Sequence, residues 1–96
     1  MKRRNDQSLK EALDGLVEAY GLREKLDQQS IASFWDEIAG AMIARHTVSV
    51  KLRRGKLSIK VDSAPLRHEL TYMREPLITL INQRMERVVV KEMVLE

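Results

Sequence analysis

The chain has 96 residues, a net charge of +3 and 44% hydrophobic residues. A chain of this length buries only about two-thirds of its unfolded surface, so it is predicted to form one domain around one core. Because the sequence contains no cysteine, disulfide scaffolds, thiolate zinc sites and cysteine nucleophiles are excluded. Neither a secretion signal nor a run of roughly 20 apolar residues is found, which predicts a cytoplasmic protein without membrane contact.

The charge is unevenly distributed along the chain. Residues 1–10 carry a local charge of +3, and residues 47–61 carry +5 without an acidic residue, which leaves −5 for the remainder. Basic segments that are segregated in this way favour acidic partners.

The chain is predicted to have two parts. Residues 1–7 form a flexible basic arm, in which Arg3 and Arg4 are candidate phosphate contacts. Residues 8–96 form the single domain.

The first predicted helix begins at Ser8 and ends before Gly21. Ser8 and Glu11 have the spacing of a capping box. Glycine supplies the left-handed conformation in which many helices stop. Between these signals, apolar residues recur at helical spacing and predict one stripe, made of Leu9, Ala12, Leu13, Leu16, Val17 and Tyr20.

A longer amphipathic helix is predicted to follow. Residues 22–29 predict a short helical turn with Leu22 and Leu26 pointing inward. Either Ser30 or Asp27 then caps the next helix. Its buried stripe is expected to contain Ile31, Phe34, Trp35, Ile38, Ala39, Met42 and Ile43.

Residues 47–61 predict a basic β-hairpin. Two strands, 47–53 and 56–61, flank an Arg54-Gly55 turn, and glycine at its second position suits the positive φ of a type I′ turn. Apolar residues alternate strictly along both strands, so one sheet face is predicted to be apolar and the other basic. The cations expected on or beside the basic face are Lys51, Arg53, Arg54, Lys56 and Lys60.

The last third of the chain predicts a third helix and a final strand. Ser63 is the expected N-cap, with Pro65 in the first turn. Pro76 lies inside the helical pattern and predicts a kink or a restart at Glu75-Pro76. Residues 88–95 predict the last strand. The inner face of the helix is expected to contain Leu66, Leu70, Met73, Leu77, Leu80 and Ile81.

The predicted element order is α-α-β-β-α-(α)-β. This order indicates an α+β fold, in which a small three-stranded sheet, at least partly antiparallel, is covered on one face by helices.

No constellation for catalysis is found in the sequence. Its glycines are scattered, so a phosphate-binding loop is excluded. Neither His46 nor His68 has the partners of a metal site. His68 and Glu69 are adjacent in a predicted helix and therefore do not face each other. The chain is accordingly predicted to be no enzyme and to need no metal, cofactor or small-molecule substrate.

The basic face favours contact with phosphate. Lysine and arginine bind nucleic-acid backbones by neutralising charge and releasing counterions. No aromatic residue is expected on this face, so contact would follow the backbone and tolerate any sequence. The alternative is that exposed cations only keep the sheet soluble and its edges unpaired.

The sequence contains an ordered series of four motifs: Trp35-x-x-Ile38-x-Gly40-x-x-Ile43-Ala44-x-His46-Thr47, Gly55-x-Leu57-x-Ile59-x-Val61-x-Ser63, Leu66-Arg67-x-Glu69-Leu70 and Leu80-Ile81-Asn82. This series resembles the DciA family, bacterial proteins similar to loaders of the DnaB helicase and long grouped as a domain of unknown function. The resemblance covers the chain from about Ser8 to Leu95, and the opening residues 1–5 resemble the short members from Bacteroidetes-type bacteria.

This resemblance implies a K-homology-like fold and a part in chromosome replication, through contact with the replicative DNA helicase and with single-stranded or forked DNA. The chain departs from related proteins in two ways. Longer family members carry a flexible extension, whereas this chain ends at Glu96, directly after the last predicted strand. The Gly-x-x-Gly loop of K-homology domains is absent, so the fold analogy alone does not imply their way of reading RNA.

The leading hypothesis is a non-enzymatic module that helps to place the helicase on DNA. Trp35, Arg67 and Arg74 are the candidate partner contacts, although core packing is the first expectation for Trp35. A protein adaptor whose basic face meets an acidic partner, and an RNA-binding module, are the alternatives. The sequence leaves a homodimer open, because residues 88–90 at a sheet edge could pair with a second copy.

Overall fold

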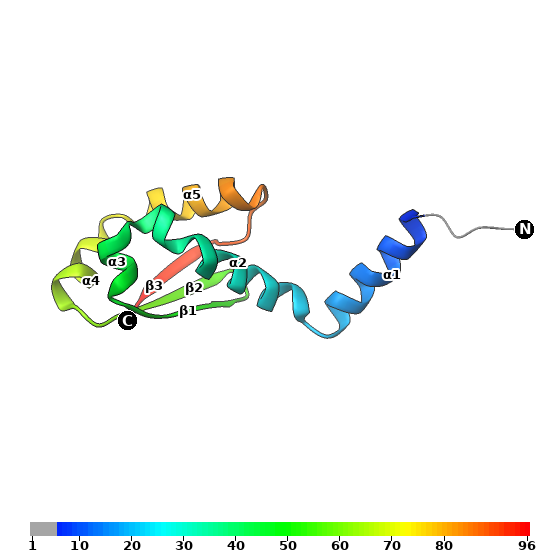
Figure 1. Ribbon diagram of the computed structural model, residues 1–96, viewed down its shortest axis with the longest axis horizontal. Coiled ribbons are helices and arrows are strands. Elements are labelled where there is room, and N and C mark those ends of the chain that lie inside the picture. Colours follow the sequence, from blue (N-terminus) through cyan, green and yellow to red (C-terminus); the bar gives the residue numbers. More distant parts are fainter. Residues whose placement is uncertain (1–5) are drawn as a thin grey trace, which may run out of the picture.

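The computed structural model describes the backbone of residues 6–96 and the side chains of residues 8–96. Helices α2, α3 and α5 lie over one face of the sheet, α4 lies near one end, and α1 projects away from the rest (Figure 1). The predicted α+β class and element order are confirmed. The elements are α1 (Asp6–Ala19), α2 (Leu22–Ala39), α3 (Ala41–Arg45), β1 (Thr47–Arg53), β2 (Lys56–Val61), α4 (Ala64–Thr71), α5 (Arg74–Met85) and β3 (Glu92–Leu95).

The sheet is mixed and has the order β1-β2-β3. Strands β1 and β2 are antiparallel, and β3 pairs with β2 in parallel. This direction follows from the connection, because α4 and α5 carry the chain back to the end of the sheet from which β2 began. The predicted type I′ turn is confirmed, since φ is 52° at Arg54 and 80° at Gly55.

The core lies between the sheet and helices α2, α4 and α5. Ile31, Phe34 and Trp35 have the spacing of one helix face and are buried there. Arg84 of α5 lies over the Phe34 ring, 4.9 Å from its centroid, and donates to Glu37 of α2 at 2.8 Å. The other buried side chains are Ile43, Leu52, Leu57, Ile59, Val61, Leu70, Leu77, Ile81, Val89, Val90 and Met93.

The start of the helical region differs from the prediction. Helix α1 begins at Asp6, so Ser8 is not its N-cap. Residues 22–39 form the single helix α2 rather than a turn and a separate helix. Asp27 is therefore no cap: it is buried inside α2, where it pairs with Arg87. Leu22 and Leu26 are 40% and 53% exposed, because the first turns of α2 extend past the sheet (Figure 1).

Three further boundaries differ. Gly40, with φ of 97°, separates α2 from α3 and leaves Met42 exposed. The break near Pro76 lies at residues 72–73 instead, because proline is tolerated in the first turn of α5. Leu80, expected on the inner face of the helix, is 45% exposed. The last strand is shorter than predicted, since residues 88–91 form a loop.

Asn82 organises this loop. Its Oδ1 accepts hydrogen bonds from the backbone N–H groups of Val89 and Val90, both at 2.9 Å, and its Nδ2 donates to the Val90 carbonyl at 2.9 Å. The side chain therefore replaces the strand pairing that these residues lack, while the Val89 and Val90 side chains enter the core.

We expect Asn82→Ala to lower the free energy of unfolding by about 2–4 kcal/mol, because two backbone donors next to the core lose their acceptor. Urea denaturation measures the change. Gln83→Ala, at the exposed neighbouring position, is the control and should change stability by less than about 0.5 kcal/mol. Equal effects of the two substitutions would contradict this role of Asn82.

Candidate nucleic-acid interface

The outer face of the sheet is a grid of three residues from each strand, where Glu96, which directly follows β3, is counted with that strand. The strand registers align them in three rows, because paired residues of neighbouring strands point to the same face. The same parallel register continues to Glu96, whose N–H donates to the Ile59 carbonyl at 2.9 Å and whose carbonyl accepts from Val61 at 2.9 Å. The rows, each from β1 to β3, are Arg53-Lys56-Glu92, Lys51-Ser58-Val94 and Ser49-Lys60-Glu96.

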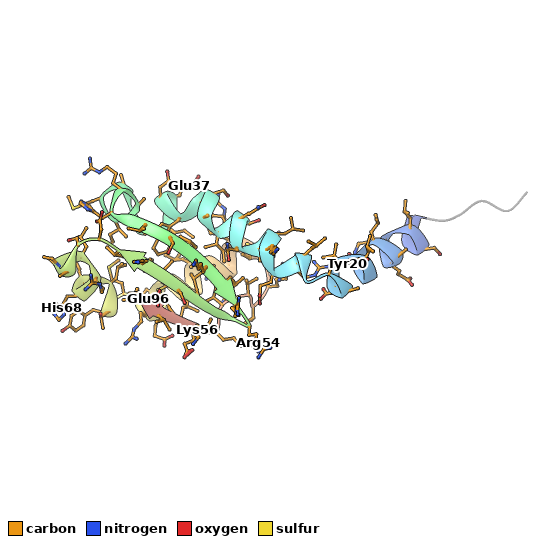
Figure 2. All side chains as sticks on the ribbon, turned by 90° about the horizontal axis from the view of Figure 1, so that it is seen from below. Tyr20, Glu37, Arg54, Lys56, His68 and Glu96 are labelled. Carbon is orange, nitrogen blue, oxygen red and sulfur yellow. The ribbon has the colours of Figure 1, made fainter. Side chains whose placement is uncertain are left out.

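The structure brings the predicted cations of the hairpin together. Lys51, Arg53, Lys56 and Lys60 share the outer face. Arg54 lies in the turn at one end of the sheet (Figure 2). All five side chains are exposed. Within the part of the chain that the structure describes, none of them takes part in an ion pair. Their charges are therefore available to a ligand.

Strand β3 adds acidic residues that the sequence analysis did not assign to this face. It counted only the hairpin, whereas Glu92 is the registered neighbour of Lys56, and Glu96 lies beside Lys60. We call Glu92 and Glu96 the acidic rim. The signal was the even spacing of Glu92 and Glu96 in a terminal strand, but it needed the β2–β3 pairing to become informative.

The turn end of the face has two more neighbours that sequence reasoning missed. The aliphatic part of Lys91 lies against Gly55, where an added Cβ would be 3.5 Å from it, so this lysine adds a cation beside the turn. A carboxylate oxygen of Glu24, on α2, accepts a hydrogen bond from the Arg54 N–H. Gln28 accepts from the Leu52 N–H at 2.9 Å in the same way. Helix α2 thus holds the free edge of β1 in place.

The remaining predicted site residues do not join this face. Arg3 and Arg4 of the basic arm lie outside the described residues. Trp35 is 3% exposed, and its side chain belongs to the core. Arg67 is half-buried and donates to the Val61 carbonyl at 3.3 Å, whereas Arg74 is exposed at the start of α5.

The described part of the chain offers no catalytic arrangement. A groove of about 480 Å³ between α2 and β1 has Asp36 as its one ionisable lining residue. No group of three His, Cys, Asp or Glu side chains able to hold a metal ion is found in residues 8–96. Across the same residues, no helix has the length and apolar character needed to cross a membrane.

Comparison with known proteins identifies the family. The family model described as "Dna[CI] antecedent, DciA" matches residues 8–95. The chain belongs to the DciA family. No curated protein matches the sequence.

Membership in the DciA family implies a general function. The family is associated with loading of the DnaB helicase in replication initiation, and its members are non-enzymatic helicase operators. The match includes the whole basic hairpin, the acidic rim residue Glu92 and nearly all of α1.

The hydroxyl of Thr47 explains the place of Trp35. It accepts from the indole Nε1–H of Trp35 at 3.0 Å and donates to the Ile43 carbonyl at 2.7 Å. Both partners lie in or next to the core, so the hydroxyl satisfies a donor and an acceptor that water reaches poorly.

We expect Thr47→Val to cost about 1–2 kcal/mol of stability, because the shape is kept while the indole N–H and the carbonyl lose their partner. DNA binding should not change. Thr79→Val, at an exposed position of α5, is the matched control in the same denaturation experiment. Unchanged stability of Thr47→Val would show that Trp35 does not depend on this bond.

Proposed function

We propose that this DciA chain is a binding module that holds DNA on the outer face of its sheet while a separate surface contacts the replicative helicase. The observation that supports the DNA site is the set of exposed cations on β1, β2 and the turn, none of which is paired within the described residues. In this role the protein acts in the cytoplasm, where the family acts.

Phosphate is the part of DNA that this face fits. Lys51 and Arg53 point the same way from β1 and stand about 7 Å apart, two residues along a strand. They can therefore contact successive phosphates of an extended backbone. No aromatic side chain lies on the outer grid, so base stacking adds nothing and binding should tolerate any sequence.

Helix α1 is the surface that we assign to the helicase. Leu9, Leu13, Leu16 and Tyr20 recur at spacings of four and three residues on one side of α1, and each is 46% exposed or more. A lone helix of 14 residues is marginal in water. A helix with such an exposed apolar stripe is stabilised when a partner covers the stripe, as when an amphipathic helix binds in a hydrophobic groove.

The ion pairs of α1 set the direction of this stripe. Asp14 and Glu18 lie on the opposite side of the helix and both contact Arg23 of α2. Lys10, through its hydrogen bond and its charge, lowers the pKa of Asp14, so this carboxyl group stays ionised. The acidic side of α1 therefore faces the start of α2, and the apolar stripe faces away from it.

We expect Lys51→Glu/Arg53→Glu to weaken binding of fluorescent single-stranded DNA at least about tenfold at 0.1 M salt, because two phosphate contacts become repulsive. For the wild type, contacts from Lys51, Arg53 and Arg54 predict a slope of log affinity against log salt of about −2. Fluorescence anisotropy across a salt series measures both quantities.

The matched control is Arg45→Glu/Arg74→Glu, which changes the net charge equally at two exposed positions on α3 and α5. It should retain most of the affinity. Thermal unfolding of both variants should stay within a few degrees of the wild type. Equal losses in the two variants would mean that net charge, rather than this face, attracts DNA. A wild type that binds the helicase but no DNA would be a protein adaptor. A wild type that prefers structured RNA to DNA would be an RNA-binding module.

We expect Leu13→Gln/Leu16→Gln to weaken binding of the cognate replicative helicase at least about tenfold, since two side chains of the stripe lose their apolar contact. DNA binding and the melting temperature should be unchanged, because α1 lies outside the core. Glu11→Gln, on the polar side of α1, is the control in the same titration. Full helicase affinity of the double variant would place the contact elsewhere.

A further inference from the structure

The charges on the outer grid change sign across the sheet. The β1 column holds Ser49, Lys51 and Arg53, whereas the β3 column holds Glu92, Val94 and Glu96. Between them, the two lysines of β2 each have a glutamate of β3 as neighbour. The face is therefore a gradient from positive at β1 to negative at β3, and not a uniform basic surface.

We infer that this gradient makes the face selective for single-stranded over duplex DNA: one strand lies along β1, and the acidic rim of Glu92 and Glu96 keeps a second strand off the face. This inference rests on the proposed DNA-binding function and names the form of DNA that the same site takes.

The distances across the sheet make the rim effective. Neighbouring strands lie about 4.8 Å apart, so the backbone of β3 is roughly 10 Å from that of β1. The Debye length at physiological salt is about 8 Å. A phosphate over β1 is thus partly screened from the rim, whereas a phosphate over β2 or β3 experiences its full repulsion.

The rim also weakens the two lysines that lie next to it. Lys56 and Lys60 form no ion pair in the described residues, but each has Glu92 or Glu96 as its cross-strand neighbour, and the nearby negative charge lowers the positive potential that a phosphate meets there. Lys51 has Ser58 and Val94 in its row and keeps its full charge for a ligand. Together with Arg53 and Arg54, it makes the β1 side the favoured path.

Single-stranded and duplex DNA respond differently to this change of charge across the face. A single strand is flexible and can follow β1 while the rest of it turns away from the rim. Duplex DNA carries twice the charge per length and is stiff over about 150 base pairs. When one of its backbones lies on β1, the other cannot bend away, and part of the duplex is held over the acidic side of the face.

The test compares a fluorescent single-stranded oligonucleotide with a hairpin duplex of the same sequence, using the wild type and Glu92→Gln/Glu96→Gln. We expect the wild type to prefer the single strand at least about fivefold at 0.1 M salt, and the variant to gain about five- to tenfold in duplex affinity but about twofold in single-strand affinity. The preference should therefore largely disappear in the variant.

Glu11→Gln/Glu69→Gln is the matched control, since it raises the net charge equally at exposed positions of α1 and α4. It should raise both affinities by the same small factor and keep the preference. Equal gains for both DNA forms in the rim variant, or a wild type that prefers duplex, would overturn the inference but leave the DNA-binding function intact. A wild type that binds neither form would overturn the proposed function and the inference with it.

Discussion

The parallel pairing of β3 with β2 is the constraint on which the rest of this structure depends. It joins the end of the chain to the hairpin and places Met93 and Leu95 on the core side of the sheet. Its register is held at the turn end, where the Gly55 carbonyl accepts hydrogen bonds from the N–H groups of Lys91 at 2.8 Å and Glu92 at 3.2 Å. A slip by one residue would turn Glu92 and Glu96 inward and Met93 and Leu95 outward.

The same pairing decides the chemistry of the opposite face. Because side chains alternate along a strand, burying Met93 and Leu95 obliges Glu92 and Glu96 to lie beside the lysines of β2. The apolar core and the charge gradient are therefore two consequences of one register. The bonds of Asn82 to the loop before β3 support both, since they fix where β3 begins.

The hairpin could be predicted from the sequence because its determinants are local. Alternation and an Arg54-Gly55 turn predict both strands, the turn type and the cationic side chains, but not the register shift between Thr47 and Ser49, where Val48 is 59% exposed instead of lying on the apolar face. The acidic rim could not be predicted, because it depends on pairing between segments about 36 residues apart, which no local pattern specifies.

For the helices too, the sequence predicts local features but not which distant residues they contact. The stripe of α1 was found from its period, but the period does not tell whether a stripe packs on its own core or stays exposed. Asp27 illustrates the point further: an acidic residue at a favourable position resembles a helix cap, but α2 already begins at Leu22, and the distant Arg87 pairs with the buried Asp27 carboxylate.

The two proposed binding surfaces meet at one end of the molecule. The hairpin turn with Arg54 is the end of the sheet nearer to Tyr20, at the base of α1 (Figure 2). Glu24 joins these regions directly, since it belongs to the first turn of α2 and accepts from the Arg54 N–H. A strand of DNA that follows β1 toward the turn would therefore leave the face beside α1. A helicase bound to α1 would then stand where that strand emerges, so that both ligands are held at once without competing for the same side chains.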